Sequence, residues 1–135
     1  MNPISSDQAC ILLVFEIMGV RIGMDARQIA RTTDCHLPLP PATNRYYFHE
    51  RVSFRERLSD YLAPVILHPA PHLALDGVIV VDQLQAMRTI DCRNIHRLPR
   101  WLASQQTPFW GVALLEDGLV LLADLTRLLP RQSHA

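Results

Sequence analysis

The chain has 135 residues, 49% of them hydrophobic, which is enough to bury the core of one domain or of two small subdomains. Its 13 basic and 13 acidic side chains cancel, which argues against a nucleic acid or an anionic membrane surface as partner. The longest apolar runs fall far short of the ~20 residues that cross a bilayer. The first residues lack the basic region of an export signal, so we expect a cytoplasmic protein.

Short β-forming runs in the first half of the chain predict strands. They cover residues 11–17, 20–24, 46–48, 52–54 and 64–67. The first two form a hairpin, because Met18-Gly19 permits a tight turn between them. Asp25 and Gln28 have the spacing of a capping box, so a short helical turn that carries Ile29 should follow and dissolve over residues 32–34. Three prolines hold residues 37–41 extended.

The last third of the chain contains the most informative pattern. Two apolar runs flank Asp117-Gly118, which is the strongest local signal for a β-hairpin. Both runs are apolar on both faces, which predicts strands buried on both sides, either inside a closed barrel or between a barrel and a partner. Asp124 is the expected N-cap of a final helix that buries its leucines and stops at Pro130. Upstream, the pattern predicts a buried strand over residues 78–81, a long bent strand over 83–90 and a turn over 97–102. Many short strands at ~8–12-residue intervals imply an all-β barrel or sandwich.

Candidate acid, base and metal-binding groups each have a structural interpretation beside the functional one. His68 and His72 have a spacing that some zinc sites use, but the prolines between them forbid the helix that would align them. Surface histidines in a loop are therefore the better interpretation. Asp76, Asp82 and Asp91 could supply a general acid and base, but a turn explains the first and a strand end the second.

The cysteines carry a similar pair of interpretations. Cys10, Cys35 and Cys92 are an odd number at wide spacing, which argues against a secreted disulfide framework. Cys35 beside His36, and Cys92 four residues before His96, could each pair a thiolate with a base, yet cysteine is among the most buried residue types. The sequence contains no phosphate loop, no Gly-x-Ser-x-Gly and no His-Glu-x-x-His motif. We therefore expect no enzyme activity, no metal site and no cofactor.

Two further segments could bind partners. The prolines of residues 38–41 could be a polyproline ligand, but they lack flanking positive charge, so a rigid connector is the better interpretation. Trp101, Phe109 and Trp110 form an aromatic cluster that could anchor a partner. Core packing where a barrel closes explains the same cluster at least as well.

The order of segments resembles that of the CheW-like domain, the adaptor module of bacterial chemosensory arrays. Residues 12–25 are similar to the family's opening hairpin, and Ile29 and Arg31 occupy the turn that follows it. Three later segments also have family counterparts: residues 52–58 match a strand end, residues 77–82 a Gly-x-x-Val-Asp strand, and residues 111–129 the last hairpin and leucine-rich ending. These segments stand in the family's order over nearly the whole chain.

The resemblance implies a mostly β fold of two intertwined, small five-stranded barrel subdomains of the Src-homology type, with short helices that include one at the C-terminus. We expect one domain over residues 1–135, with residues 8–30 plus 78–130, and residues 44–77, contributing to the two subdomains and tails at 1–7 and 131–135. The implied function is that of a non-catalytic adaptor. It would couple a CheA-type histidine kinase to the cytoplasmic tip of methyl-accepting chemoreceptors, in chemotaxis or in pilus motility, with no nucleic acid and no membrane insertion.

Departures from the family pattern bear on partner binding. Arg31 stands where the family has a glutamate, which reverses the charge at an expected docking edge. Arg45 falls where a family motif has its arginine, but Tyr46 replaces the glycine of that motif and the segment before it is shortened. Ile29, Arg31 and Arg45 are therefore the predicted partner-binding residues of a divergent coupling protein. The alternatives are a stand-alone β-barrel binding module outside chemosensory arrays and a thiol- or metal-dependent enzyme.

Overall fold

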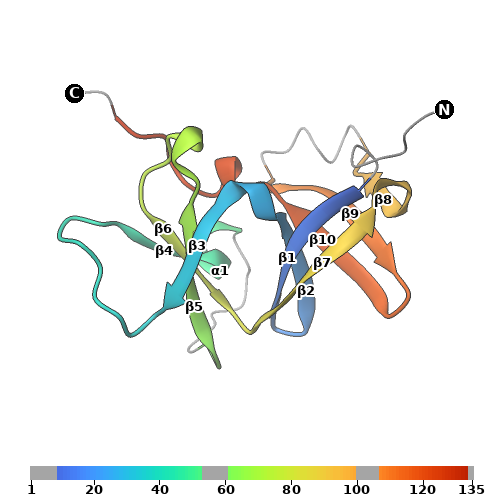
Figure 1. Ribbon diagram of the computed structural model, residues 1–135, viewed down its shortest axis with the longest axis horizontal. Helices are drawn as coiled ribbons and strands as arrows, with labels where there is room; N and C mark the ends of the chain where they lie inside the picture. Colours follow the sequence, from blue (N-terminus) through green and yellow to red (C-terminus); the bar gives the residue numbers. More distant parts are fainter. Residues whose placement is uncertain (1–8, 53–60, 100–106, 134–135) are drawn as a thin grey trace.

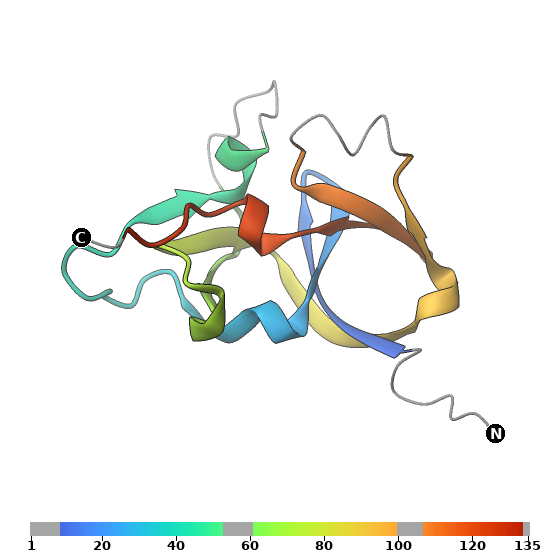
Figure 2. The ribbon, with the colours of Figure 1, turned by 90° about the horizontal axis from the view of Figure 1, so that it is seen from above.

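The computed structural model describes residues 9–52, 61–99 and 107–133. Within these ranges ten strands form a six-stranded and a four-stranded sheet (Figures 1 and 2). The helical elements there are the four-residue helix α1 (Phe48–Arg51) and short 3-10 turns. The predicted fold class, mostly β in two parts with short helices, is confirmed, although the described strands divide six and four rather than five and five. None of the helices in these ranges has the length and apolarity to cross a membrane.

The six-stranded sheet has the strand order β7-β1-β2-β10-β9-β8 and curls around its own interior (Figure 2). Its strands are β1 (Ala9–Ile17), β2 (Val20–Asp25), β7 (Leu84–Asp91), β8 (Ile95–Arg97), β9 (Phe109–Leu115) and β10 (Gly118–Ala123). The predicted hairpin at Asp117-Gly118 is confirmed, and Gly118 has a φ of 131° that favours glycine. β10 lies parallel to β2, with Leu121 opposite Ile22. The first and last hairpins of the chain are thereby joined in one sheet.

The four-stranded sheet has the order β3-β5-β6-β4, so that β3 and β4 are its edges. Its strands are β3 (Ile29–Asp34), β4 (Arg45–Tyr47), β5 (Pro64–Pro69) and β6 (Val78–Asp82). The predicted connector, residues 37–41, links β3 to β4 and forms no strand. Gly77 precedes β6 with a φ of 89°, and a Cβ at this position would lie 2.6 Å from the carbonyl oxygen of Asn44. Only glycine therefore lets β4 begin this close to β6.

Alternation along the strands sorts the apolar side chains into three buried clusters. The largest, which we call the shared core, draws on both sheets and includes Phe15, Ile22, Phe48, Leu67, Ile79 and Leu128. The interior of the six-stranded sheet holds Leu12, Val14, Ile90, Ala113, Val120 and Leu122. The third cluster, in the four-stranded sheet, contains Ile66, Val78 and Val80. Residues 12–15 of β1 and 78–81 of β6 lie between an interior and the shared core, so both faces of these segments are buried and all their side chains are apolar.

The last hairpin is not enclosed on both faces by the described chain, so a closed barrel interior is wrong as the setting for both faces, and burial against a partner stays a prediction. Leu114 of β9 and Leu119 of β10 are 47% and 49% exposed. The reason is that the tip of this hairpin points away from the four-stranded sheet (Figure 1), so the shared core covers only the other end of the strands. Apolar residues on both faces here indicate one buried and one partly exposed face.

The final helix is reduced to one 3-10 turn, η5 (Leu125–Arg127), although Asp124 caps it as predicted by accepting a hydrogen bond from the backbone N–H of Thr126. The chain cannot continue as a helix because residues after the turn pair elsewhere. Leu75 forms a β-bridge with Arg131, and the Asp76 N–H donates to the Pro130 carbonyl oxygen at 2.8 Å. These contacts hold the C-terminal segment extended.

The predicted capping box at Asp25 and Gln28 does not form. Asp25 does cap a 3-10 turn, η2 (Ala26–Gln28), but the side chain of Gln28 hydrogen-bonds to Asp124 and Leu125 instead of closing the box. Residues 29–34 form strand β3 rather than dissolving, because β5 offers them a pairing partner. The predicted strand 46–48 ends at Tyr47, after which α1 begins. Residues 53–54 and 100–102, from a predicted strand and turn, lie outside the described residues.

Candidate docking surfaces

The edge strand β3 carries two of the three predicted partner-binding residues. Within the described residues β3 pairs only with β5, so its other side presents backbone N–H and C=O groups that no strand satisfies. Residues 30–32 are exposed on this strand. An exposed edge of this kind can accept an added strand from a partner.

Ile29 and Arg31 lie two residues apart on β3 but in different surroundings. Ile29 is half-buried, packs against the shared core and pairs with Pro69. Arg31 is exposed, pairs with His68 and lines a cavity of about 530 Å³ that also touches segments 42–43 and 75–78. A substitution at Ile29 therefore disturbs packing, whereas Arg31 can be changed at the surface alone.

Arg31 is the positive charge of this edge, because its histidine neighbour is neutral. His68 Nε2 lies 2.8 Å from Oγ1 of Thr33, in a hydrogen bond across the β3–β5 pair. Burial, and then the positive charge of Arg31, hold the pKa of His68 below its ordinary value of 6.5. The imidazole is therefore uncharged at neutral pH.

Arg45, the third predicted residue, lies on β4 at the opposite edge of the same sheet. It is exposed, pairs with Val78 and places its Nη1 3.7 Å from Sγ of Cys35. The structure thus brings Ile29 and Arg31 together and leaves Arg45 at the other edge.

A second surface lies on the first and last hairpins of the chain. Met18, Val20, Leu114 and Leu119 are 47%, 38%, 47% and 49% exposed, and we call them the hairpin patch. Leu114 and Leu119 are direct cross-strand partners, and the parallel register of β10 on β2 brings Leu119 into line with Val20. A row of exposed apolar side chains is typical of a docking surface. Its sequence signal was the doubly apolar hairpin, which fits a barrel interior and a docking surface equally well.

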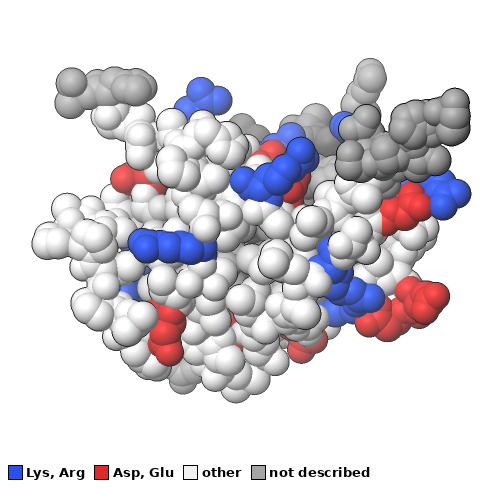
Figure 3. Space-filling view, in the orientation of Figure 1, with Lys and Arg blue, Asp and Glu red and all other residues white. Residues whose placement is uncertain are grey.

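An ion cluster stands at the tip of the same hairpin. Asp117 lies 3.1 Å from both Arg21 and Arg88. Hydrogen bonds from Arg88 and then from Arg21 outweigh partial desolvation and hold the pKa of Asp117 below its ordinary value of 3.8. Over the rest of this face, charges of both signs are scattered without a broad field of either sign (Figure 3). The hairpin patch is therefore bordered by a small ion cluster and not by a broad field of one charge.

The candidate catalytic groups make structural contacts. Asp76 accepts from an asparagine side chain, Asp82 from a backbone N–H, and Asp91 from an arginine two residues further on. His68 lies on β5 rather than in a loop, and His72 lies in the 3-10 turn η3 (Pro71–Leu73). In the part of the chain that the structure describes, no three His, Cys, Asp or Glu side chains are grouped so that they could hold a metal ion.

The aromatic cluster divides between two sites. Phe109 packs against Phe48 with ring centroids 6.3 Å apart, at the shared core. Trp110, its neighbour on β9, lines a cavity at one end of the six-stranded sheet. Trp101 lies outside the described residues. Phe109 and Trp110 therefore do not form one anchor.

A repeated corner also escaped the sequence analysis. Residues 25–29 and 91–95 share the pattern Asp-x-Arg-amide-Ile. In each, the aspartate Oδ1 accepts from the arginine backbone N–H at 2.9 Å, and a 3-10 turn leads into the next strand. The second turn is η4 (Cys92–Asn94). The pentapeptide similarity was the signal that could have predicted the two equivalent corners.

Two joined β-sheets with an exposed edge strand and an apolar hairpin patch define a β scaffold whose surfaces suit docking. No protein-family model and no curated protein sequence matches the chain. Among solved structures, the chain is similar to the crystal structure of scaffolding protein TtCheW from Thermoanaerobacter tengcongensis. The TM-score is 0.63 at 14% sequence identity, over 84% of this chain and 88% of that chain. The chain therefore has a CheW-like fold.

Proposed function

We propose that this protein is a non-catalytic, cytoplasmic adaptor that couples a CheA-type histidine kinase to chemoreceptors in a chemotaxis or pilus-motility system. The observation that carries the proposal is the CheW-like fold over 84% of the chain. The exposed edge strand and the hairpin patch support it, because an adaptor needs accessible surfaces on a rigid scaffold. His68, Asp76 and Asp82 support it too, since each makes a hydrogen bond within the scaffold.

We assign the kinase contact to the β3 edge, with Ile29 supplying apolar area and Arg31 the charge. An arginine in place of the family's glutamate requires a carboxylate on the facing kinase surface. Because the histidine beside it is neutral at pH 7, Arg31 is the charge that such a carboxylate would meet. Arg45, on the far edge strand, belongs to a separate contact.

The test measures binding of the purified protein to the regulatory domain of the CheA-type kinase encoded in the same genome. Arg31→Glu should weaken binding at least about tenfold, or about 1.4 kcal/mol, because two like charges would then face each other. Arg97→Glu is the matched control, since Arg97 is an exposed arginine on the other sheet. Ile29→Asp is less suitable because Ile29 also packs on the shared core.

The proposal is wrong if the wild-type protein binds no kinase or receptor of the host. Capture of a protein unrelated to chemosensing would then favour the stand-alone β-barrel module. Equal binding by Arg31→Glu and Arg97→Glu would retain the adaptor and remove the β3 edge as the kinase contact.

A further inference from the structure

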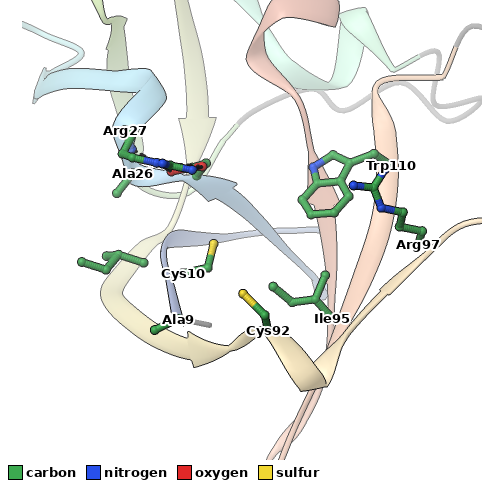
Figure 4. Close-up of a pocket in the computed structure, with 10 residues that line it drawn as sticks. Ala9, Cys10, Ala26, Arg27, Cys92, Ile95, Arg97 and Trp110 are labelled. Carbon is green, nitrogen blue, oxygen red and sulfur yellow. Dashed lines mark hydrogen bonds and ion pairs between the residues drawn. The ribbon is translucent and has the colours of Figure 1, made fainter. Parts of the chain in front are cut away.

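One end of the six-stranded sheet opens into a cavity of about 750 Å³ (Figure 4). The start of β1, the corner after β2, the turn η4, β8 and the start of β9 form its walls. Ile95 and Trp110 supply apolar wall, and Arg97 supplies charge. Two of the chain's three cysteines, Cys10 and Cys92, line the same cavity. The opening therefore gives solutes of moderate size access to a pair of thiols.

The strand register explains why the two cysteines meet. Ala9 pairs with Asp91 and Cys10 pairs with Ile90 across β1 and β7. Cys92 follows Asp91 directly, so it lies on the face of Ile90 and diagonally across from Cys10. Diagonal neighbours of an antiparallel pair have Cα atoms about 7–8 Å apart, with Cβ atoms somewhat closer. Figure 4 shows both sulfur atoms at this cavity: that of Cys92 points toward the side of Cys10, and that of Cys10 points toward the corner after β2.

We propose that Cys10 and Cys92 form a dithiol that low-molecular-weight disulfides oxidise to an intramolecular disulfide. Closure needs the Cα atoms within about 6.8 Å, so only a small movement of η4 toward β1 is required. The movement falls on a turn of three residues. The site is independent of the docking surfaces, because none of its lining residues belongs to the β3 edge or the hairpin patch.

The two thiols have different roles. Cys92 is exposed, whereas Cys10 is partly buried. Burial, then the charges of Asp25 and Cys92, raise the pKa of the Cys10 thiol, and its partial burial limits the access of an oxidant from solution. Cys92 is therefore the attacking group and Cys10 the resolving group.

With glutathione disulfide as oxidant, the exchange balances in two steps. The Cys92 thiolate attacks one sulfur of glutathione disulfide, forming a mixed disulfide and releasing one glutathione thiolate. Cys10 then loses its proton to solvent and attacks Sγ of Cys92, which releases the second glutathione thiolate. Two protein thiols are oxidised, one glutathione disulfide is reduced to two glutathiones, and each released thiolate takes up one proton.

The test incubates the reduced full chain with excess glutathione disulfide and follows intact mass and cysteine-containing peptides. The wild type should lose about 2 Da, the mass of two hydrogens, carry no glutathione on Cys10 or Cys92, and yield a peptide that links the two. Cys10→Ser should stop at the mixed disulfide on Cys92, because no resolving thiol remains. Cys35→Ser is the matched control and should close as the wild type does, since Cys35 does not line this cavity.

Three outcomes would overturn the proposal. They are a wild-type protein that keeps glutathione on Cys92, a crosslink between two chains in place of the internal disulfide, and a linked peptide that contains Cys35. The wild-type measurement alone decides the matter if either serine variant fails to fold.

Discussion

The side chain of Gln28 links the two sheets by hydrogen bonds, and its replacement should lower the free energy of unfolding. Gln28 follows Arg27 in the corner between β2 and β3, whereas its partners follow β10. Its Nε2 donates to Oδ1 of Asp124 at 3.0 Å, and its Oε1 accepts from the backbone N–H of Leu125 at 3.0 Å. Leu125 is fully buried, so no water replaces the lost acceptor. Gln28→Met keeps the side-chain volume and removes both hydrogen bonds.

The expected loss of unfolding free energy follows from these two contacts. A hydrogen bond to a charged group contributes about 1.5–3 kcal/mol, and an unsatisfied buried N–H costs about 1–3 kcal/mol. Because Asp124 is only part-buried, water recovers some of the first contribution. We therefore expect a loss of about 2–3 kcal/mol. Urea unfolding should show it as a lower midpoint with an unchanged slope.

The loss should also depend on pH. Burial alone would raise the pKa of Asp124, but hydrogen bonds from Gln28 and Thr126 and the charge of Arg127 hold it below its ordinary value of 3.8. A carboxyl with a depressed folded-state pKa stabilises the protein above its unfolded pKa, and this stability is lost as pH falls through the folded-state value. The difference in unfolding free energy between wild type and Gln28→Met should therefore be largest at neutral pH and become smaller below pH 3.8.

Gln85→Met, on an exposed position of β7, is the control and should leave the unfolding free energy unchanged. A loss below about 0.5 kcal/mol for Gln28→Met, less than one ordinary hydrogen bond contributes, would refute the reasoning. A loss of unfolding free energy that stays constant from pH 7 to pH 2 would mean that the contact with Leu125 stabilises the protein and that the contact with the Asp124 carboxylate does not.

The remaining predictions concern packing and surface charge. Phe15→Ala should cost about 3–5 kcal/mol of unfolding free energy in urea, because Phe15 is fully buried and contacts Phe48 edge to face with centroids 5.2 Å apart. Gly111→Ala should lower the free energy of unfolding by about 1–3 kcal/mol, since a Cβ would lie 2.7 Å from the carbonyl oxygen of His96 and would push β8 from β9. Thermal unfolding tests this, and an unchanged melting temperature would contradict it. Asp117→Asn should cost less than about 1 kcal/mol at pH 7, because the Asp117 side chain is 57% exposed and its contacts with Arg21 and Arg88 are screened by water, and a larger loss would show that the cluster supports the hairpin.

The hairpins and most strands could be predicted because they depend on neighbours in the sequence. Glu116 and Asp117 form the turn, Gly118 follows it with a φ of 131° and pairs with Leu115, and the flanking apolar runs then pair with each other. The long bent strand is likewise confirmed as β7, with a register shift where it passes Leu13 and Phe15. The contacts of each hairpin lie within one short segment, so a local pattern contains the information. β7 pairs with the distant β1, and only its own extended apolar pattern was local.

Predictions from local spacing were wrong where a distant segment of the chain offered the same side chains or backbone groups another partner. Asp25 and Gln28 have capping-box spacing, yet Asp124 offered Gln28 a charged acceptor 96 residues away. Residues 29–34 became a strand because β5 was available as a partner. The final helix stopped after one turn because Arg131 pairs with Leu75. In each case, local spacing was correct for the structure that would form in isolation.

The candidate sites show the same division. Ile29, Arg31 and Arg45 were chosen from family positions, which already placed the first two in one turn, but nothing in the sequence indicated that Arg45 lies at the opposite edge of the same sheet. The sequence could not separate the hairpin patch from a barrel interior, because a strand buried on both faces and one exposed on part of a face have the same apolar composition.

By itself the sequence determined the β content, the turns and the alternation of side chains, since these follow from the torsional preferences and hydrophobicity of adjacent residues. Only the tertiary structure decided which apolar face meets a second sheet, which strands remain edges, and which cysteines become neighbours. Those outcomes depend on the pairing of β1 with β7 and of β2 with β10. Such pairing joins segments far apart in the chain, and its free energy is shared among many contacts that no local pattern contains.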